Sequence, residues 1–188
     1  YQRSRGLGDV YKRQNKERDL IKGDFSNYGF ELRLLKKYIL LDKKSVFLIG
    51  SKYYKSNNYS EQGPGSAFKN ADFSFYKNEF PNYNNQSRYN YPNLNFALFS
   101  ENIFYLSEKF SITPGLRFEY IKTQSDGFYK KINLDGAGNV ILNQTINNSE
   151  IRKRNFFLFG VGASYKPTKS VELYANVSEN YRSVTFAD

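Results

Sequence analysis

The residues best suited to chemistry in this sequence are cations grouped near position 153. The stretch IRKRN places Arg152, Lys153 and Arg154 next to one another. From Lys122 to Arg154 the chain has six basic residues against three acidic ones, a local net charge of +3. A guanidinium can hold two oxygens of one carboxylate or phosphate at once. We therefore expect this segment to attract an anion, with Arg152 and Arg154 as ligand-binding residues.

Three further arginines are candidates for the same chemistry. Arg88 lies in a segment, residues 57–93, whose acidic and basic residues balance, so anion attraction should be stronger in the later segment. Arg117 is followed two residues later by Glu119, which favours a ladder of charges between strands as its simpler role. Arg182 follows the last regular pattern of the chain. We include Arg88, Arg117 and Arg182 among the predicted ligand-binding residues.

Missing residue types exclude much catalytic chemistry. The chain has no cysteine and no histidine. Disulfides, thiolate nucleophiles, histidine-containing triads and most zinc hydrolase sites are therefore excluded. An enzyme would have to use carboxylates, lysines or tyrosines, and no pair of these has a spacing that indicates a site. We predict a protein that is not an enzyme and has neither a metal site nor a cofactor.

The elements that must position the cations alternate in polarity. In SITPGLRFEY, residues 111–120, apolar or aromatic residues occupy every second position, while small or charged residues occupy the others. A period of two indicates a β-strand with unlike faces. Such a strand suits a site with lipid on one side and a watery lumen on the other. A mean hydropathy of −0.69 is compatible with this, because only alternate residues would meet lipid.

Six segments have this strand character and a length suited to crossing a membrane. They are residues 28–38, 46–56, 95–106, 110–122, 156–165 and 171–181. The alternation does not fix which face of 95–106 is apolar. The longest apolar run, FFLFGVGA, is far shorter than the roughly 20 residues that a membrane helix needs. We predict an all-β fold made of an antiparallel up-and-down meander.

The connections alternate in length: short, long, short, long, short. The short ones lie near Asp42, Glu108 and Thr168 and suit tight hairpins. The long ones, residues 57–93 and 123–155, would both fall at the same end of a meander. Within the second, residues 132–146 have two alternating arms around DGAGN, which predicts a small hairpin above the rim of the sheet.

Several stretches resemble the barrel of TonB-dependent outer-membrane receptors. LSEKFSITPGLRFEY is similar to a short periplasmic turn and the strand after it, and LFGVGASYKPTKSVELYANVSENYRSVTFAD to a later hairpin. EQGPGSAFKNADFSF and TQSDGFYKKINLDGAGNVILNQTI resemble loops of ferric-dicitrate-type receptors. The resemblance covers residues 23–188 and is more specific for the family than for the subtype.

The resemblance implies a location, a fold and a set of partners. It implies the outer membrane of a Gram-negative bacterium, and about six strands of a 22-stranded barrel with long extracellular loops and short periplasmic turns. The ligand would be a ferric chelate, either ferric dicitrate or a siderophore complex. Membrane lipid, lipopolysaccharide and the TonB complex would be partners, the last through a plug domain that this chain lacks. We therefore expect a fragment that would neither close a barrel nor transport alone.

The first 14 residues are expected to be foreign to the barrel. YQRSRGLGDVYKRQ has no apolar period, no capping pattern and no secretory signal, and it resembles translated sequencing adapter. We therefore predict that residues 15–188 form the partial barrel. Without this segment the net charge falls from +10 to +7 and is spread along the chain. No nucleic-acid motif accompanies it, so we expect no nucleic-acid partner.

Two other functions remain open from the sequence. The first is import of another cargo, such as a glycan or cobalamin, by a receptor of the same family. The second is a surface adhesin or soluble β-rich binding module that uses its tyrosine-rich loops. The second would bury an apolar core between two sheets, whereas each strand here keeps one polar face.

Overall fold

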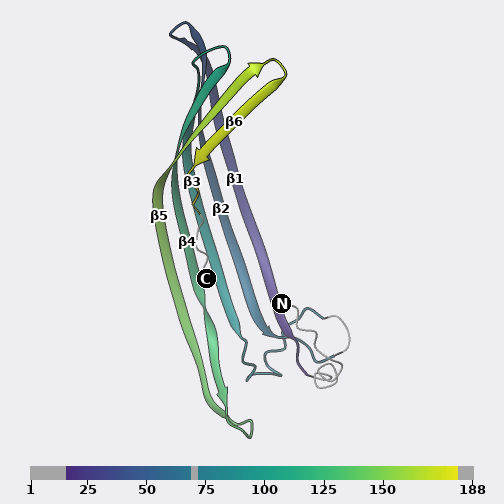
Figure 1. Ribbon diagram of the computed structural model, residues 1–188. Coiled ribbons are helices and arrows are strands. Elements are labelled where there is room, and N and C mark those ends of the chain that lie inside the picture. Colours follow the sequence, from purple (N-terminus) through teal and green to yellow (C-terminus); the bar gives the residue numbers. More distant parts are fainter. Residues whose placement is uncertain (1–15, 69–71, 182–188) are drawn as a thin grey trace. The chain divides into compact units, whose positions relative to one another are not determined.

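The described residues form a single antiparallel β-sheet. The computed structural model describes residues 16–68 and 72–181. Its strands pair in chain order, β1 to β6 (Figure 1), which is an up-and-down meander. Their bounds are β1 Asp19–Leu40, β2 Lys43–Pro64, β3 Ser87–Tyr105, β4 Phe110–Leu134, β5 Val140–Thr168 and β6 Val171–Ser178. The predicted fold class is confirmed. No helix long and apolar enough to cross a membrane occurs in this described part.

All six predicted strands are present, but five of them, β1 to β5, are considerably longer than predicted. β4 was expected to end near residue 122 and continues to Leu134, and β5 begins at Val140 instead of 156. The prediction of a second long loop at residues 123–155 was therefore wrong. The two arms predicted for a separate hairpin are the ends of β4 and β5, which pair with each other beyond the segments predicted to cross the membrane. β6 ends earlier than expected, at Ser178.

Short turns connect the strands where the sequence placed them. Leu41 and Asp42 join β1 to β2, and both have positive φ, 51° and 58°. Two successive residues of this kind form the mirror-image turn that matches the twist of a hairpin. Between β4 and β5 the Asp135 carboxylate accepts hydrogen bonds from the backbone N–H groups of Ala137 and Asn139, at 2.9 and 2.7 Å. That contact explains why DGAGN is a turn.

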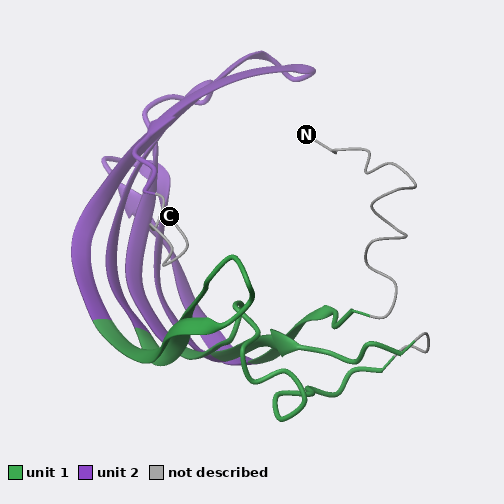
Figure 2. Ribbon diagram, turned by 90° about the horizontal axis from the view of Figure 1, so that it is seen from below, with its two compact units in different colours: residues 1–25, 58–91, 125–150 green, residues 26–57, 92–124, 151–188 purple. Residues whose placement is uncertain are grey.

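The chain divides into two compact units (Figure 2). Unit 1 contains residues 1–25, 58–91 and 125–150, and unit 2 contains residues 26–57, 92–124 and 151–188. Unit 2 holds the three short turns. Unit 1 holds the first long connection and the turn at residues 135–139. Each unit is described by itself below.

The strands of unit 2 have one apolar and one polar face. On the apolar face Phe30 stacks on Tyr53 with ring centroids 5.5 Å apart, and Phe118 lies 5.2 Å from Phe157. Where β5 pairs with β6, Val161 faces Val177 and Tyr165 faces Leu173. This face remains open: the exposed fraction is 62% for Leu32 and 57% for Phe157.

The sheet encloses no dry core. Ala97 and Ile132 are the buried hydrophobic residues among those described. A sandwich of two sheets would bury many such residues between its layers, and these strands form one layer. The adhesin alternative in its two-sheet form therefore does not match this fold. An open apolar face on a single layer is instead suited to contact with hydrocarbon.

Candidate functional site

On the polar face of unit 2 one aromatic ring contacts two guanidiniums. The Arg33 and Arg117 guanidinium carbons lie 5.7 and 5.6 Å from the centroid of the Phe99 ring. Gly50 makes room for this ring, because a Cβ atom at that position would overlap it. The stack settles the face that the sequence left open in β3: Phe99 points to the polar face.

Carboxylates complete the charge pattern around this stack. The Arg33 guanidinium donates to Glu31 at 2.5 Å, and Arg117 Nε donates to Glu119 Oε1 at 2.6 Å. Asn95 Nδ2 donates to Glu119 Oε2 at 2.9 Å from the neighbouring strand. Both ion pairs join residues two apart, which share a strand face. Glu119 is 8% exposed, so its pairing with Arg117 and Asn95 offsets the cost of burying a carboxylate.

The polar face is hollowed beside this stack. A depression of about 450 Å³ is lined by both guanidiniums, three carboxylates and the glycine backbone of neighbouring strands: Glu31, Arg33, Glu101, Gly115, Arg117, Gly160 and Glu179. Its ionised lining groups have a net charge of −1. This depression therefore does not provide the excess of cations that an anionic ligand requires.

The predicted cation cluster of β5 is divided between the two faces of the sheet. Burial alternates along residues 151–161, with Arg152 and Arg154 half-buried and Lys153 exposed. Phe157, which has the parity of Lys153, contacts Phe118 on the apolar face. Arg152 and Arg154 consequently belong to the polar face, as Arg117 does. Three predicted ligand-binding residues thus share one face of unit 2.

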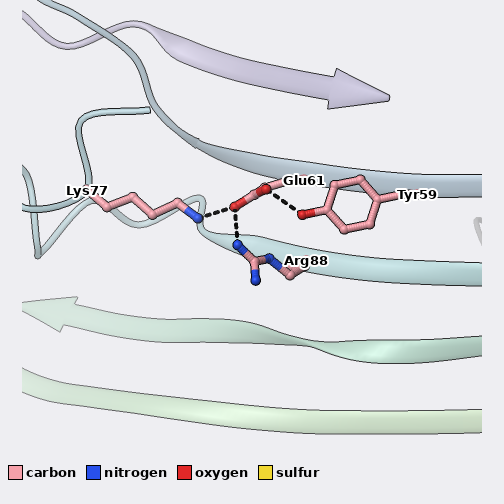
Figure 3. A network of polar contacts seen from close by, with 4 residues as sticks. All are labelled: Tyr59, Glu61, Lys77 and Arg88. Atoms are coloured by element: carbon pink, nitrogen blue, oxygen red, sulfur yellow. Dashed lines mark hydrogen bonds and ion pairs between the residues drawn. The ribbon is translucent and has the colours of Figure 1, made fainter. Parts of the chain in front are cut away.

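In unit 1 a buried carboxylate collects three donors (Figure 3). Glu61 of β2 is 7% exposed. Tyr59 donates to its Oε2 at 2.5 Å, and the Arg88 guanidinium of β3 donates to its Oε1 at 3.0 Å. Lys77, from the connection between these strands, donates to the same Oε1. We call these four residues the Glu61 network, and it ties the connection to both strands.

The Glu61 network holds its carboxylate in the charged form. Glu61 lies beyond residues 46–56, the part of its strand predicted to cross the membrane. Burial by itself raises the pKa of Glu61, but the hydrogen bonds from Lys77, Tyr59 and Arg88 outweigh burial and lower the pKa from 4.5 to about 2. The pKa of Tyr59 is raised, first by burial and then by its bond to Glu61.

The opposite face of the strands in unit 1 carries tyrosines. Tyr89 and Tyr91 stack with ring centroids 5.8 Å apart. The Tyr89 ring and the Arg88 backbone lie so close to Gly127 that a Cβ atom there would overlap both. Burial, assisted by Tyr91 and Tyr129, raises the pKa of Tyr89. Glycine at position 127 thus allows β3 and β4 to approach closely.

The structure separates the five predicted ligand-binding arginines. Arg117, Arg152 and Arg154 lie on the polar face of unit 2, as described above. Arg88 points to the other side of its strand from Tyr89 and is bonded to Glu61, so its geometry gives it a structural role; ligand binding by Arg88 stays a prediction. Arg182 lies outside the described residues.

Sequence reasoning missed the Glu61 network and the position of Phe99. The balanced charges of residues 57–93 were the available signal, because Glu61 forms ion pairs with two of the three cations counted there. The partners are 16 and 27 residues from Glu61, too far apart for a local pattern to reveal them. Within the described part of the chain no group of three or more metal-ligating side chains occurs.

Comparison with known proteins gives a family and a fold. A family model described as "TonB dependent receptor-like, beta-barrel" matches residues 2–188. The ferric yersiniabactin uptake receptor FyuA from Yersinia pestis is 12% identical with a TM-score of 0.58, and the alignment covers 84% of this chain and 21% of FyuA. The ferric citrate transporter FecA is 18% identical with a TM-score of 0.58, covering 85% of this chain and 21% of FecA.

These similarities differ in what they establish. At sequence identities this low, the similarity to the two solved structures shows a shared fold and nothing more. The chain spans about a fifth, 21%, of the length of each. One is named as a receptor and the other as a transporter, and neither as an enzyme. A search of curated proteins found no match.

Proposed function

Because this chain belongs to the TonB-dependent receptor-like β-barrel family, we propose that it is part of an outer-membrane receptor that imports a ferric chelate. The cargo would be ferric dicitrate or a ferric siderophore. The receptor would lie in the outer membrane of a Gram-negative bacterium. It would receive energy for import from the TonB complex through a plug domain. The six strands would be consecutive strands of its barrel.

The single observation that carries the choice of ligand is the position of Arg152 and Arg154. Both lie on the polar face of β5, two residues apart, in the segment whose local net charge is +3. Side chains two apart on a strand point the same way. Two guanidiniums side by side can pair with the oxygen cluster of an anionic chelate, each of them through two N–H groups.

The two named structural neighbours support the same class of cargo. FyuA is named as an uptake receptor for ferric yersiniabactin and FecA as a transporter of ferric citrate. Both names describe iron in a chelate. The open apolar face supports the proposed membrane location, since it would otherwise be exposed to water.

Replacement of both arginines by alanine tests the proposed site. In the receptor that contains this chain, the double variant Arg152→Ala, Arg154→Ala should bind ferric dicitrate or a ferric siderophore at least tenfold more weakly. Each lost charged hydrogen bond is worth about 1.5–3 kcal/mol. Titration of the purified receptor in detergent with each ferric chelate measures the affinity.

A matched control comes from the residue between them. Lys153→Ala removes one charge from the other face of the same strand, so affinity should stay within about twofold. Equal weakening in Lys153→Ala would mean that net charge, not the two guanidiniums, attracts the ligand. Unchanged affinity in the double variant would contradict the proposed role of the arginines.

A further inference from the structure

A second cavity lies within unit 1, apart from the residues assigned above to the ferric chelate. It has a volume of about 360 Å³, which is within the range of small-ligand sites. The connection after β2, the start of β3 and the far part of β4 form its wall. A backbone hydrogen bond of 2.8 Å from Lys130 N to Gln86 O holds β4 against the connection. The wall residues used below are Lys77, Asn78, Gln86, Ser87, Phe128 and Lys130.

The charged groups of this wall are cations. It contains two ammonium groups, those of Lys77 and Lys130, and no carboxylate among the described residues. Within the described part of the chain the Lys130 ammonium has no ion pair or hydrogen bond. Lys77 donates to Glu61, but an ammonium has three donors, so two remain. The wall therefore favours a ligand with an anionic group, and Lys130 is the cation available to pair with it.

Gln86 adds an acceptor that the described protein groups leave unused. Its side chain is 4% exposed. The amide Nε2 donates to the carbonyls of Pro81 and Tyr83, at 3.2 and 2.9 Å, and these two bonds fix the orientation of the amide. Its Oε1 atom receives no hydrogen bond from any described residue. A buried polar atom requires a partner, and a ligand hydroxyl can be the donor.

An aromatic ring stands next to the unpaired cation. Phe128 and Lys130 are two residues apart in β4, so their side chains leave the same face of the strand roughly 7 Å apart. A phenyl face packs against apolar C–H groups. The Asn78 amide and the Ser87 hydroxyl can donate hydrogen bonds elsewhere on the wall. A matching ligand therefore combines an anionic group, an apolar ring face and several hydroxyl groups.

The volume distinguishes a bare ion from a larger ligand. At about 30 Å³ for each water-sized group, 360 Å³ holds about twelve such groups. An inorganic anion or a single carboxylate would leave most of that space to water. A sugar ring that carries one carboxylate has about thirteen non-hydrogen atoms, which matches the volume.

We propose that this cavity binds a hexuronic acid, a sugar of the glucuronate type. Lys130 pairs with the carboxylate, and Lys77 donates to it from the connection. Gln86 Oε1 accepts a hydrogen bond from a ring hydroxyl, and Phe128 packs against the C–H face of the ring. This site is separate from ferric-chelate binding and does not depend on it, and all its residues belong to unit 1.

The test is a titration of the receptor that contains this chain, in detergent, followed by saturation-transfer NMR. The three probes are glucuronate, glucose and acetate, so that glucose has the ring without the charge and acetate the charge without the ring. Glucuronate should bind at least tenfold more tightly than either of the others. This comparison uses the wild-type receptor and requires no variant to fold.

Variants of β4 assign the binding to the cavity. Lys130→Met should weaken glucuronate binding about tenfold, and Lys130→Arg should retain most of it. Phe128→Leu keeps an apolar side chain without a ring and should weaken binding about threefold or more. The matched control is Lys131→Met, because it removes the neighbouring cation from the other face of the strand. Its affinity should stay within about twofold of the wild type.

Each contrary result has a defined meaning. Acetate or glucose that binds as tightly as glucuronate would overturn the proposal, and so would equal losses in Lys130→Met and Lys131→Met. A glucuronate trisaccharide should bind no more than tenfold more tightly than the monosaccharide; a larger gain would contradict a site for one ring. Ferric-chelate binding, measured in the same samples, should not change in Lys130→Met. If the wild-type receptor binds no ferric chelate, the proposed function fails while the glucuronate titration still decides this site.

Discussion

Glu61 shows how one side chain can fix a long connection. It sits near the end of β2, and its carboxylate receives donors from its own strand, from β3 and from the connection between them. Removing the charge would leave three donors around a neutral group in a site that is 7% exposed. Unpaired buried donors cost about 1–3 kcal/mol each, so the loss should fall on the least constrained partner. That partner is Lys77, which lies outside any strand.

Glu61→Gln should release the connection without unfolding the sheet. We expect hydrogen exchange of residues 72–83 to accelerate about tenfold or more in the complete receptor, in line with a loss of about 1–3 kcal/mol. The folded pKa of about 2 lies below the ordinary value of 4.5. The carboxylate therefore contributes its full stabilisation above pH 4.5 and loses it as pH falls toward 2. In the wild-type receptor, hydrogen exchange of residues 72–83, corrected for intrinsic rates, should therefore become faster as the pH falls toward 2.

The control for this prediction is a carboxylate of the same connection. Glu79 is exposed, so Glu79→Gln should leave exchange of residues 72–83 unchanged. The Glu61→Gln receptor should also lose most of the acid dependence of this exchange. If the wild type and Glu61→Gln respond equally to acid, another group holds the connection.

At the scale of residues, the sequence gives the charge of each segment, but it does not show which charged side chains pair with each other. The balanced composition of residues 57–93 predicts little attraction for an anion there, and this stays a prediction. The ion pairs at positions 31 and 33, and at 117 and 119, follow from strand periodicity once the strands are known. Which cation reaches Glu61 depends instead on how the connection folds back, and no local pattern encodes that.

At the scale of elements, strand order was predictable and strand length was not. The sequence located all six strands because alternation is strong where one face is apolar. Residues 123–131 and 147–155 are mostly polar on both faces, and the alternation in hydropathy is lost there, although it returns in residues 132–146. The backbone of β4 and β5 nevertheless continues to pair, since ladder hydrogen bonds do not require an apolar face. The hydropathy pattern therefore showed the far ends of β4 and β5 as a separate hairpin and did not reveal that they continue these strands.

Gly127→Val should disrupt the β3–β4 ladder at the loop end. A Cβ atom at this position overlaps the Arg88 backbone and the Tyr89 ring, and backbone cannot move aside cheaply. We expect the variant receptor to lose about 1–3 kcal/mol of stability. Faster hydrogen exchange in residues 87–91 should accompany that loss. Urea unfolding, together with exchange of that segment, measures both.

Gly136→Val is the matched control for this position. Gly136 lies in the turn between β4 and β5, and a Cβ atom there would meet nothing within 4 Å. The stability of the Gly136→Val receptor should stay within about 0.5 kcal/mol of the wild type, as for ordinary surface changes. A Gly127→Val receptor as stable as Gly136→Val would show that the two strands do not approach as closely as described.

At the scale of the whole molecule, the property that organises everything else is the division of the sheet into two unlike faces. The apolar face was predicted from a period of two, and ring contacts and strand register confirm it in unit 2. Placing Arg117, Arg152 and Arg154 on one face required the register between strands, which a sequence does not contain. A one-residue shift of β5 would have placed both β5 arginines on the other side.

The absence of cysteine allows this division to be measured directly. In a receptor that otherwise lacks accessible cysteine, single replacements along β4 should alternate in their reaction with a membrane-impermeant maleimide. Leu116→Cys and Phe118→Cys should be protected in lipid vesicles, because hydrocarbon excludes a charged reagent and keeps the thiol protonated. Thr113→Cys and Gly115→Cys, on the polar face, should react at least tenfold faster. Detergent that strips lipid without unfolding the barrel should raise the rate at position 116 more than at position 113. Equal protection at all four positions would mean that this sheet has no lipid-facing side, and the membrane location proposed for the receptor would then be wrong.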